Sequence, residues 1–126
     1  MTELPPFELG YPRTELRRQL VAAVLAGEKT ATSGLWSDFV AEADDVPAAG
    51  AHFVLHDFDD RPSAIVEVTD ARRVPAGEID VAFARDEGEG FESVEDWRIA
   101  HERFFQQPIA PDTEIVAIRF RLVKRL

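Results

Sequence analysis

Residues 14–36, TELRRQLVAAVLAGEKTATSGLW, carry the strongest structural signal in the chain. Apolar side chains such as Leu16 and Leu20 recur there at helical spacing, which predicts an amphipathic helix from about Thr14 to Ala26. Gly27 follows at the position where a glycine commonly ends a helix. The next residues are mostly small and polar, a composition that is poor for a core helix. We therefore expect the chain to leave the helix sharply and to line a cleft at its end.

The remainder of the chain alternates short helices with strands. A turn containing Asp and Pro separates two expected strands, Ala51–Asp57 and Ser63–Thr69. Short helices are expected at 36–43 and 79–84. Every second residue in 116–122 is large and apolar, which predicts a final strand with one buried face.

A longer helix is expected to begin after Ser93, which is a favourable N-cap, and to end before Pro108. The residues expected on its inner face are Trp97, Ala100, His101, Phe104 and Phe105. Helices interleaved with short strands predict an α+β fold on a small curved sheet or barrel. The length is that of a single domain, which we assign to residues 1–126.

The charge balance and the missing cysteines exclude several classes of protein. The chain has 24 Asp and Glu against 14 Lys and Arg, a formal net charge of -10, whereas a protein that coats duplex DNA needs many basic contacts to phosphate. Without cysteine there are no disulfides, no thiolate catalysis and no Cys-based metal sites. The chain shows neither a signal-peptide pattern nor about 20 consecutive apolar residues, so we expect a cytoplasmic protein with no membrane partner.

Lys29 and Thr32 are the first candidates for chemistry. A lysine supplies a cation for a phosphate or a developing oxyanion, or acts as a base when it is buried. The Thr32 hydroxyl can donate, accept or attack. Residues three apart share a face in a helical turn but not in a straight strand, so a joint site requires a bend here. The alternative is a solvated lysine in a polar loop.

The second candidate is the acidic segment DEGEGFE, residues 86–92, in which four of seven residues are carboxylates. Opposite a lysine, a glutamate of this loop can act as a general acid or base, and carboxylates also suit Mg²⁺ or Ca²⁺. The segment lacks the EF-hand pattern, and the scattered histidines offer no evident third zinc ligand, so no metal site is predicted. The alternative is a solvated loop ahead of a helix N-terminus.

Aromatic and basic residues elsewhere are candidates for holding a ligand. Trp36 can stack on a base. Arg119 and Arg121 on the last strand form a phosphate-binding rim if they converge beside Lys29. Otherwise they are salt-bridge partners for the excess carboxylates.

Three segments together resemble the ASCH domain, a small β-barrel fold related to the PUA RNA-binding domains. They are residues 15–36, 83–105 and 114–123. The family's Gly-x-Lys-x-x-Thr motif and its acidic turn with a Trp-Arg-x-x-His helix are matched by Gly27, Lys29, Thr32, Glu87, Gly88, Glu89, Gly90, Trp97, Arg98 and His101. The resemblance covers nearly the whole chain and implies an α+β, PUA-like barrel flanked by helices.

The resemblance also implies a cleft for RNA or nucleotides beside the motif. Family members include an acetylcytidine amidohydrolase and a ribonuclease. In the amidohydrolase a Lys and a Thr of the motif and a later Glu carry catalysis, and by position these are Lys29, Thr32 and Glu87, or Glu89 in place of Glu87. The family often has an Arg two residues beyond the Thr, where this chain has Gly34. The residues expected to contact substrate are Gly27, Trp36, Glu89, Arg119 and Arg121.

The leading hypothesis is a hydrolase that needs no cofactor and acts on a modified nucleoside such as acetylcytidine. In it, Lys29 activates water or Thr32, Thr32 serves as nucleophile or oxyanion donor, and Glu87 shuttles the proton. Two alternatives stay open: a ribonuclease acting on single-stranded RNA, and a non-catalytic RNA-binding module. The sequence does not specify an oligomeric state.

Overall fold

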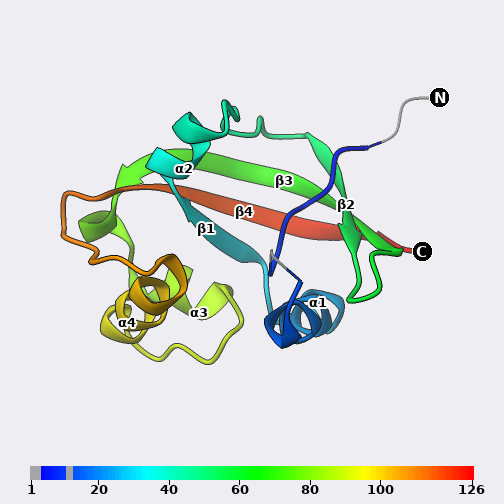
Figure 1. Ribbon diagram of the computed structural model, residues 1–126. Coiled ribbons are helices and arrows are strands. Elements are labelled where there is room, and N and C mark those ends of the chain that lie inside the picture. Colours follow the sequence, from blue (N-terminus) through cyan, green and yellow to red (C-terminus); the bar gives the residue numbers. More distant parts are fainter. Residues whose placement is uncertain (1–3, 11–12) are drawn as a thin grey trace.

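The computed structural model describes residues 4–10 and 13–126, and its mixture of helices and strands confirms the α+β class (Figure 1). The elements in chain order are α1 (Glu15–Leu25), β1 (Ala31–Leu35), α2 (Trp36–Ala41), β2 (His52–His56), β3 (Pro62–Pro75), a short 3₁₀ helix (Ala76–Glu78), α3 (Val81–Asp86), α4 (Val94–Phe105) and β4 (Glu114–Arg125). Within the described residues, no helix is long and apolar enough to cross a bilayer.

The strands form one antiparallel sheet in the order β1-β4-β3-β2. β3 and β4 are 14 and 12 residues long and run across the molecule side by side (Figure 1). Their pairing shifts register between Ile65 and Val66 and again between Val68 and Asp70. Because such bulges bend a strand and increase its twist, the sheet curls into half of a barrel rather than lying flat.

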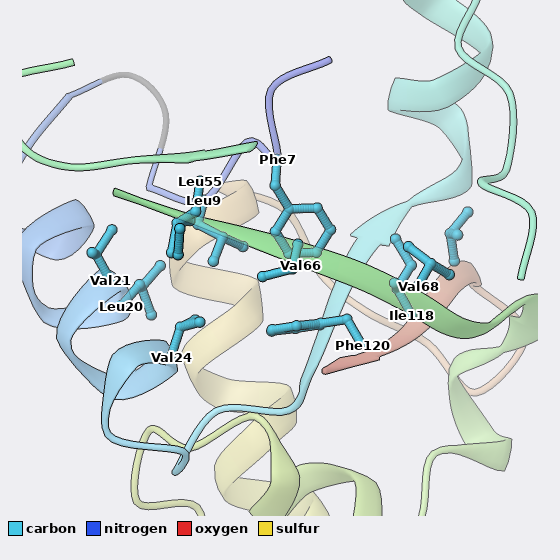
Figure 2. Packing of buried hydrophobic residues seen from close by; sticks show 12 residues of the cluster. Phe7, Leu9, Leu20, Val21, Val24, Leu55, Val66, Val68, Ile118 and Phe120 are labelled. Atoms are coloured by element: carbon cyan, nitrogen blue, oxygen red, sulfur yellow. The ribbon is translucent and has the colours of Figure 1, made fainter. Parts of the chain in front are cut away.

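The larger apolar cluster lies between α1 and the curled sheet (Figure 2). α1 contributes Leu20, Val21 and Val24, each at most 7% exposed. The ring of Phe7, from the N-terminal segment, meets the ring of Phe120 on β4 edge to face, with centroids 4.9 Å apart. Burial of each such side chain contributes about 1.5–3 kcal/mol, so this cluster fixes the end of α1 against the sheet.

A second apolar cluster joins β1 to α3 and α4. β1 contributes Ala31 and Leu35, and the helices contribute Phe83 and Trp97. Side chains alternate between the two faces of a strand. Ser33, midway between Ala31 and Leu35, therefore points to the same side as they do, toward α4.

The observed elements correct the sequence predictions in three places. The segment expected to be a polar loop forms β1, because its backbone pairs with β4 from Ala31↔Arg119 to Leu35↔Ile115. β3 continues to Pro75, beyond the expected end at Thr69, because β4 pairs with it as far as Glu114. Phe104, expected on the inner face of α4, is 50% exposed.

Candidate functional site

The end of α1 determines where Lys29 points. Gly27 has a φ of +79°, the left-handed conformation that ends a helix. The backbone N–H groups of Glu28 and Lys29 both donate to the Ala23 carbonyl, at 2.9 and 3.1 Å. The next N–H, that of Thr30, donates to the Asp86 carbonyl at 2.7 Å. The chain is thereby held between the end of α1 and the loop that follows α3.

Lys29 is a buried cation, 2% exposed. Its Nζ donates to the backbone carbonyls of Ala31 and Glu87 at 2.9 and 3.1 Å and to Oε2 of Glu89 at 3.4 Å. These three acceptors match the three N–H donors of an ammonium group. In addition, Oε1 of Glu87 lies 3.6 Å from Nζ and supplies an opposite charge. The ammonium group is therefore both hydrogen-bonded and ion-paired, as a buried charge requires.

Gly88 allows the acidic loop to approach the Lys29 segment closely. Its φ is +70°, and a Cβ atom at this position would lie 2.6 Å from both the Glu28 carbonyl oxygen and the Lys29 Cα. No side chain fits in that space, so the two backbones meet directly. This contact sets the position of Glu87, the preceding residue.

Glu87 is 1% exposed, and hydrogen bonds and charges surround both of its carboxylate oxygens. Oε2 accepts from Trp97 Nε1 at 2.6 Å and from Ser33 Oγ at 2.8 Å. Oε1 faces Lys29 Nζ at 3.6 Å and His101 Nε2 at 3.4 Å. Burial alone would raise the pKa of Glu87, but His101, Lys29 and Trp97 together hold this pKa below its ordinary value. Glu87 is therefore a carboxylate at neutral pH.

His101 reaches the same carboxylate from α4. It is 8% exposed, its Nδ1 lies 2.7 Å from the Trp97 carbonyl oxygen, and its Nε2 lies 3.1 Å from Ser33 Oγ. Burial alone would lower the pKa of His101, but the Glu87 contact, the Trp97 carbonyl and the charge of Glu89 outweigh it and raise the pKa above the ordinary value. The imidazole therefore favours its charged form.

A pocket of about 150 Å³ opens above this cluster. Its lining residues are Glu8, Leu9, Gly10, Leu16, Thr32, Ser33, Glu87, Glu89, Phe91, Ala100, His101 and Phe104. A neighbouring hollow of about 480 Å³ shares Glu89, Phe91 and Ala100 with it. Drug-sized ligands typically occupy roughly 300–1,000 Å³. The smaller pocket thus suits a group the size of one ring, with the hollow available to a larger substituent.

The structure brings together four of the residues singled out in the sequence. Glu87 and Glu89 both contact Lys29, and Thr32 lies on the pocket wall together with the two glutamates. Lys29 lies behind that wall. The contact between the lysine and the acidic loop, which the residue types allow and the family resemblance implies, is therefore present.

The other predicted contact residues do not line the pocket. Gly27 has its structural place at the end of α1. The ring of Trp36 lies under the Arg73 guanidinium at 4.2 Å. Arg119 pairs with Asp86 at 2.7 Å, and Arg121 pairs with Glu67 at 3.2 Å. Of the two alternatives for these arginines, the structure therefore has the salt-bridge partners and not a basic rim that lines the pocket.

Two pocket residues that contact Glu87, namely Ser33 and His101, were not predicted from the sequence as site residues. His101 was expected on the inner face of its helix, which its burial confirms, yet it also lines the pocket. The four-residue spacing from Trp97 was a signal for His101, whereas no local pattern predicted the strand that orients Ser33. Among the side chains described, no group of three or more His, Cys, Asp and Glu is arranged to hold a metal ion.

A protein-family model for the ASCH domain matches residues 9–124, which include every element of this site from Lys29 to His101. The chain belongs to the ASCH domain family. No curated protein matches the chain. The chain is also similar to solved structures, including the following. Protein EF3133 from Enterococcus faecalis V583 has 27% sequence identity and a TM-score of 0.81, over 99% of this chain and 78% of that one. An ASCH domain from Lactobacillus crispatus JV V101 has 26% identity and a TM-score of 0.73, over 84% and 71%.

At one position this ASCH domain departs from the pattern expected of the family. Gly34 replaces the arginine that often stands two residues beyond the motif threonine. A Cβ atom at Gly34 would lie 3.1 Å from a ring carbon of Phe39 on α2. A side chain at this position would require that ring to shift by a few tenths of an ångström.

Proposed function

We propose that this ASCH domain is a hydrolase that removes the acyl group from the amine of a modified nucleoside such as acetylcytidine. The observation that carries the proposal is the buried Lys29–Glu87 pair at the base of a small pocket. Thr32 and Ser33, two residues that carry hydroxyl groups, line the same pocket. Acyl transfer requires a nucleophile such as a hydroxyl group, a base that takes its proton, and a positive charge that stabilises the oxyanion.

The lining of the pocket favours a nucleoside over a phosphorylated ligand. Glu8, Glu87 and Glu89 lie in it, whereas the lining residues described include no lysine or arginine. Phosphate groups would be repelled there, while the N–H groups of a base would find carboxylate acceptors. Phe91 and Phe104 supply flat apolar surfaces on which a base can stack.

In the proposed reaction the Thr32 hydroxyl, or a water molecule, attacks the amide carbonyl. The proton lost by the attacking oxygen passes to Glu87 and then to the departing nitrogen, so that an amine leaves. The positive charge of Lys29 stabilises negative charge at the base of the pocket as the reaction proceeds. If Thr32 attacks first, water then hydrolyses the acyl ester in a second step of the same kind and restores the hydroxyl.

The test is hydrolysis of acetylcytidine by the purified protein, followed by chromatography. We expect cytidine to form, and Lys29→Ala and Glu87→Gln to lower turnover by about 10²- to 10⁴-fold, the usual contribution of acid–base catalysis. Lys124→Ala and Glu42→Gln, at exposed positions outside the pocket lining, are the matched controls.

Unchanged turnover in Lys29→Ala or in Glu87→Gln would contradict the proposal. Absence of cytidine with the unmodified protein would do so as well, and would direct attention to RNA. Cleavage of single-stranded RNA would then indicate a ribonuclease. Binding that weakens steeply with salt and yields no product would indicate an RNA-binding module.

A further inference from the structure

His101 is a buried, titratable group at the pocket for which the reaction above has no use. Its side chain lies among three aromatic rings, with the Trp97 ring stacked on it at 4.5 Å and those of Phe91 and Phe105 at 5.8 and 5.7 Å. Aromatic faces stabilise a cation and exclude water from it. The site therefore holds an imidazole in surroundings suited to a positive charge, next to the proposed proton carrier Glu87.

The hydrogen bonds determine where the protons are. The Trp97 carbonyl oxygen only accepts, so the His101 Nδ1 that faces it at 2.7 Å carries a hydrogen. Oε2 of the Glu87 carboxylate also only accepts, so Ser33 donates its one hydroxyl hydrogen to it, at 2.8 Å. Ser33 Oγ can then only accept from His101 Nε2, at 3.1 Å. Both ring nitrogens carry hydrogen, and His101 is an imidazolium.

We propose that His101, Ser33 and Glu87 form a proton relay in which the Ser33 hydroxyl carries a proton between the His101 ring and the Glu87 carboxylate. Nε2 gives its proton to Ser33 Oγ while Ser33 gives its own to Oε2 of Glu87. The ion pair becomes a neutral imidazole and a neutral carboxylic acid, and the total charge of the three groups does not change. The inference rests on the proposed function, for which it names the source of the proton that the departing amine needs.

The relay answers a difficulty in the proposed chemistry. A carboxylate stabilised by four neighbouring groups holds protons poorly, yet Glu87 must deliver one to the amine. His101 lends that proton through Ser33, and the proton lost by the attacking oxygen afterwards returns through Glu87 and Ser33 to His101, so that all three groups regain their starting charges. The other charged groups that face this cluster are Lys29 behind Glu87 and two glutamates on the pocket wall, Glu89 and Glu8. Binding a neutral base between the glutamates displaces water from them, which strengthens every charge interaction in the cluster.

The decisive experiment uses the full chain without substrate. NMR follows the His101 ring nitrogens and the Glu87 carboxyl carbon as the pH is raised. We expect both nitrogens to be protonated at about pH 7 and the Glu87 carboxyl carbon to respond to the His101 transition as well as to its own. In Ser33→Ala this response should weaken, because only the direct contact of 3.4 Å between His101 Nε2 and Glu87 Oε1 remains, and in Glu87→Gln the pKa of His101 should fall. His52, on β2 and outside the cluster, is the internal control for the NMR signals.

A neutral His101 at about pH 7 in the unmodified protein would overturn the relay, as would a Glu87 carboxyl carbon that does not respond to the His101 transition. Either result is obtained whether or not acetylcytidine is a substrate, so failure of the relay is distinguishable from failure of the proposed function.

Kinetics provides a second test once turnover has been observed. Ser33→Ala should lower kcat by about 10- to 100-fold with little change in KM, and Ser33→Thr should recover most of kcat because it restores a hydroxyl. In His101→Gln the fall in kcat at alkaline pH should disappear. Equal kcat in Ser33→Ala and the unmodified protein would contradict the role of Ser33.

Discussion

Among the residues described by the structure, Arg17 and Lys29 are both buried and both paired with a carboxylate, and the two pairs differ in where the carboxylate lies. Arg17 on α1 is 3% exposed, and its partner Asp60, in the turn between β2 and β3, is 59% exposed. Lys29 is as deeply buried, and its partner Glu87 is 1% exposed. The first pair connects helix and turn at the surface, whereas the second lies wholly inside, below a pocket.

The exposure of the carboxylate distinguishes the structural pair, Arg17–Asp60, from the candidate reactive pair, Lys29–Glu87. Water around Asp60 screens its charge, so the pair with Arg17 has a weak field and a small effect on stability. Lys29 and Glu87 are both buried, so solvent screens this pair less, and each charge acts more strongly on the other and on a ligand in the pocket. Because the pair is buried, removing one partner should lower the stability of the fold strongly, since the other charge then stays buried without a counter-charge.

The largest effect is expected from Lys29→Met, which removes the cation and keeps a similar apolar chain length. Glu87 is left with a buried charge and without its lysine, so we expect the free energy of unfolding to fall by about 3–5 kcal/mol. The pKa of Glu87 should rise, since the charge of Lys29 is one cause of its lowered value. Chemical denaturation measures the first quantity and NMR of the carboxyl carbon the second.

The double variant Lys29→Met/Glu87→Leu is the control for that prediction. Replacing a whole buried ion pair by apolar groups is often neutral or stabilising, so much of the lost stability should return while activity stays absent. If the double variant is as unstable as the single one, the lost stability comes from packing around residue 29 and not from an unpaired charge.

The next effect in size is expected from Gly88→Ala. A Cβ atom there would meet the backbone of residues 28 and 29 at 2.6 Å, and alanine is strained at a φ of +70°. Backbone strain of this kind costs about 1–3 kcal/mol, and the loop must also move away from Lys29. We expect reduced stability together with loss of turnover. Gly90→Ala is the matched control, because Gly90 also has a positive φ but has no atom near its Cβ position.

A smaller, pH-dependent effect is expected from His101→Gln. The raised pKa of His101 means that its charge stabilises the fold fully below about pH 6.5, and that this stabilisation is lost as the pH rises through the folded-state value. The lowered pKa of Glu87 gives stabilisation that is present above about pH 4.5 and lost as the pH falls through its folded-state value. Thermal unfolding should therefore show the largest gap between His101→Gln and the unmodified protein at about pH 5–6. A gap that widens at alkaline pH would contradict the charged His101.

The helices and the last strand could be predicted from the sequence because their signals are local. The apolar spacing in α1, the Ser93 cap of α4 and the alternation in β4 all appear in the structure at or near the expected residues. β1 has no such signal, since residues 31–35 read ATSGL, and it becomes a strand only because β4 pairs with it. That pairing joins residues about 80 positions apart, which local patterns do not encode.

The same distinction applies to the site. The pairing of Lys29 with the acidic loop followed from residue types and a family resemblance, and the geometry contains it. Ser33 was missed because its orientation depends on the strand that local patterns did not predict. Arg119 and Arg121 were expected near a ligand because of their charge, but their orientation follows from the register of β4 against β1 and β3. A sequence shows which charged side chains a protein has. It does not show which side chains will lie next to them in the folded structure.

The smallest effect is expected at the other pair of the comparison, from Asp60→Asn. This change removes the charge opposite Arg17 and keeps a side chain of the same size that still accepts hydrogen bonds. Because Asp60 is exposed, we expect a loss of no more than about 1 kcal/mol in the free energy of unfolding and no change in turnover. Denaturation at low and high salt tests the physical reason, since screening should reduce the loss further. A loss as large as that of Lys29→Met would mean that Arg17 depends on Asp60 as Lys29 does on Glu87, and that exposure of the carboxylate does not separate the two pairs.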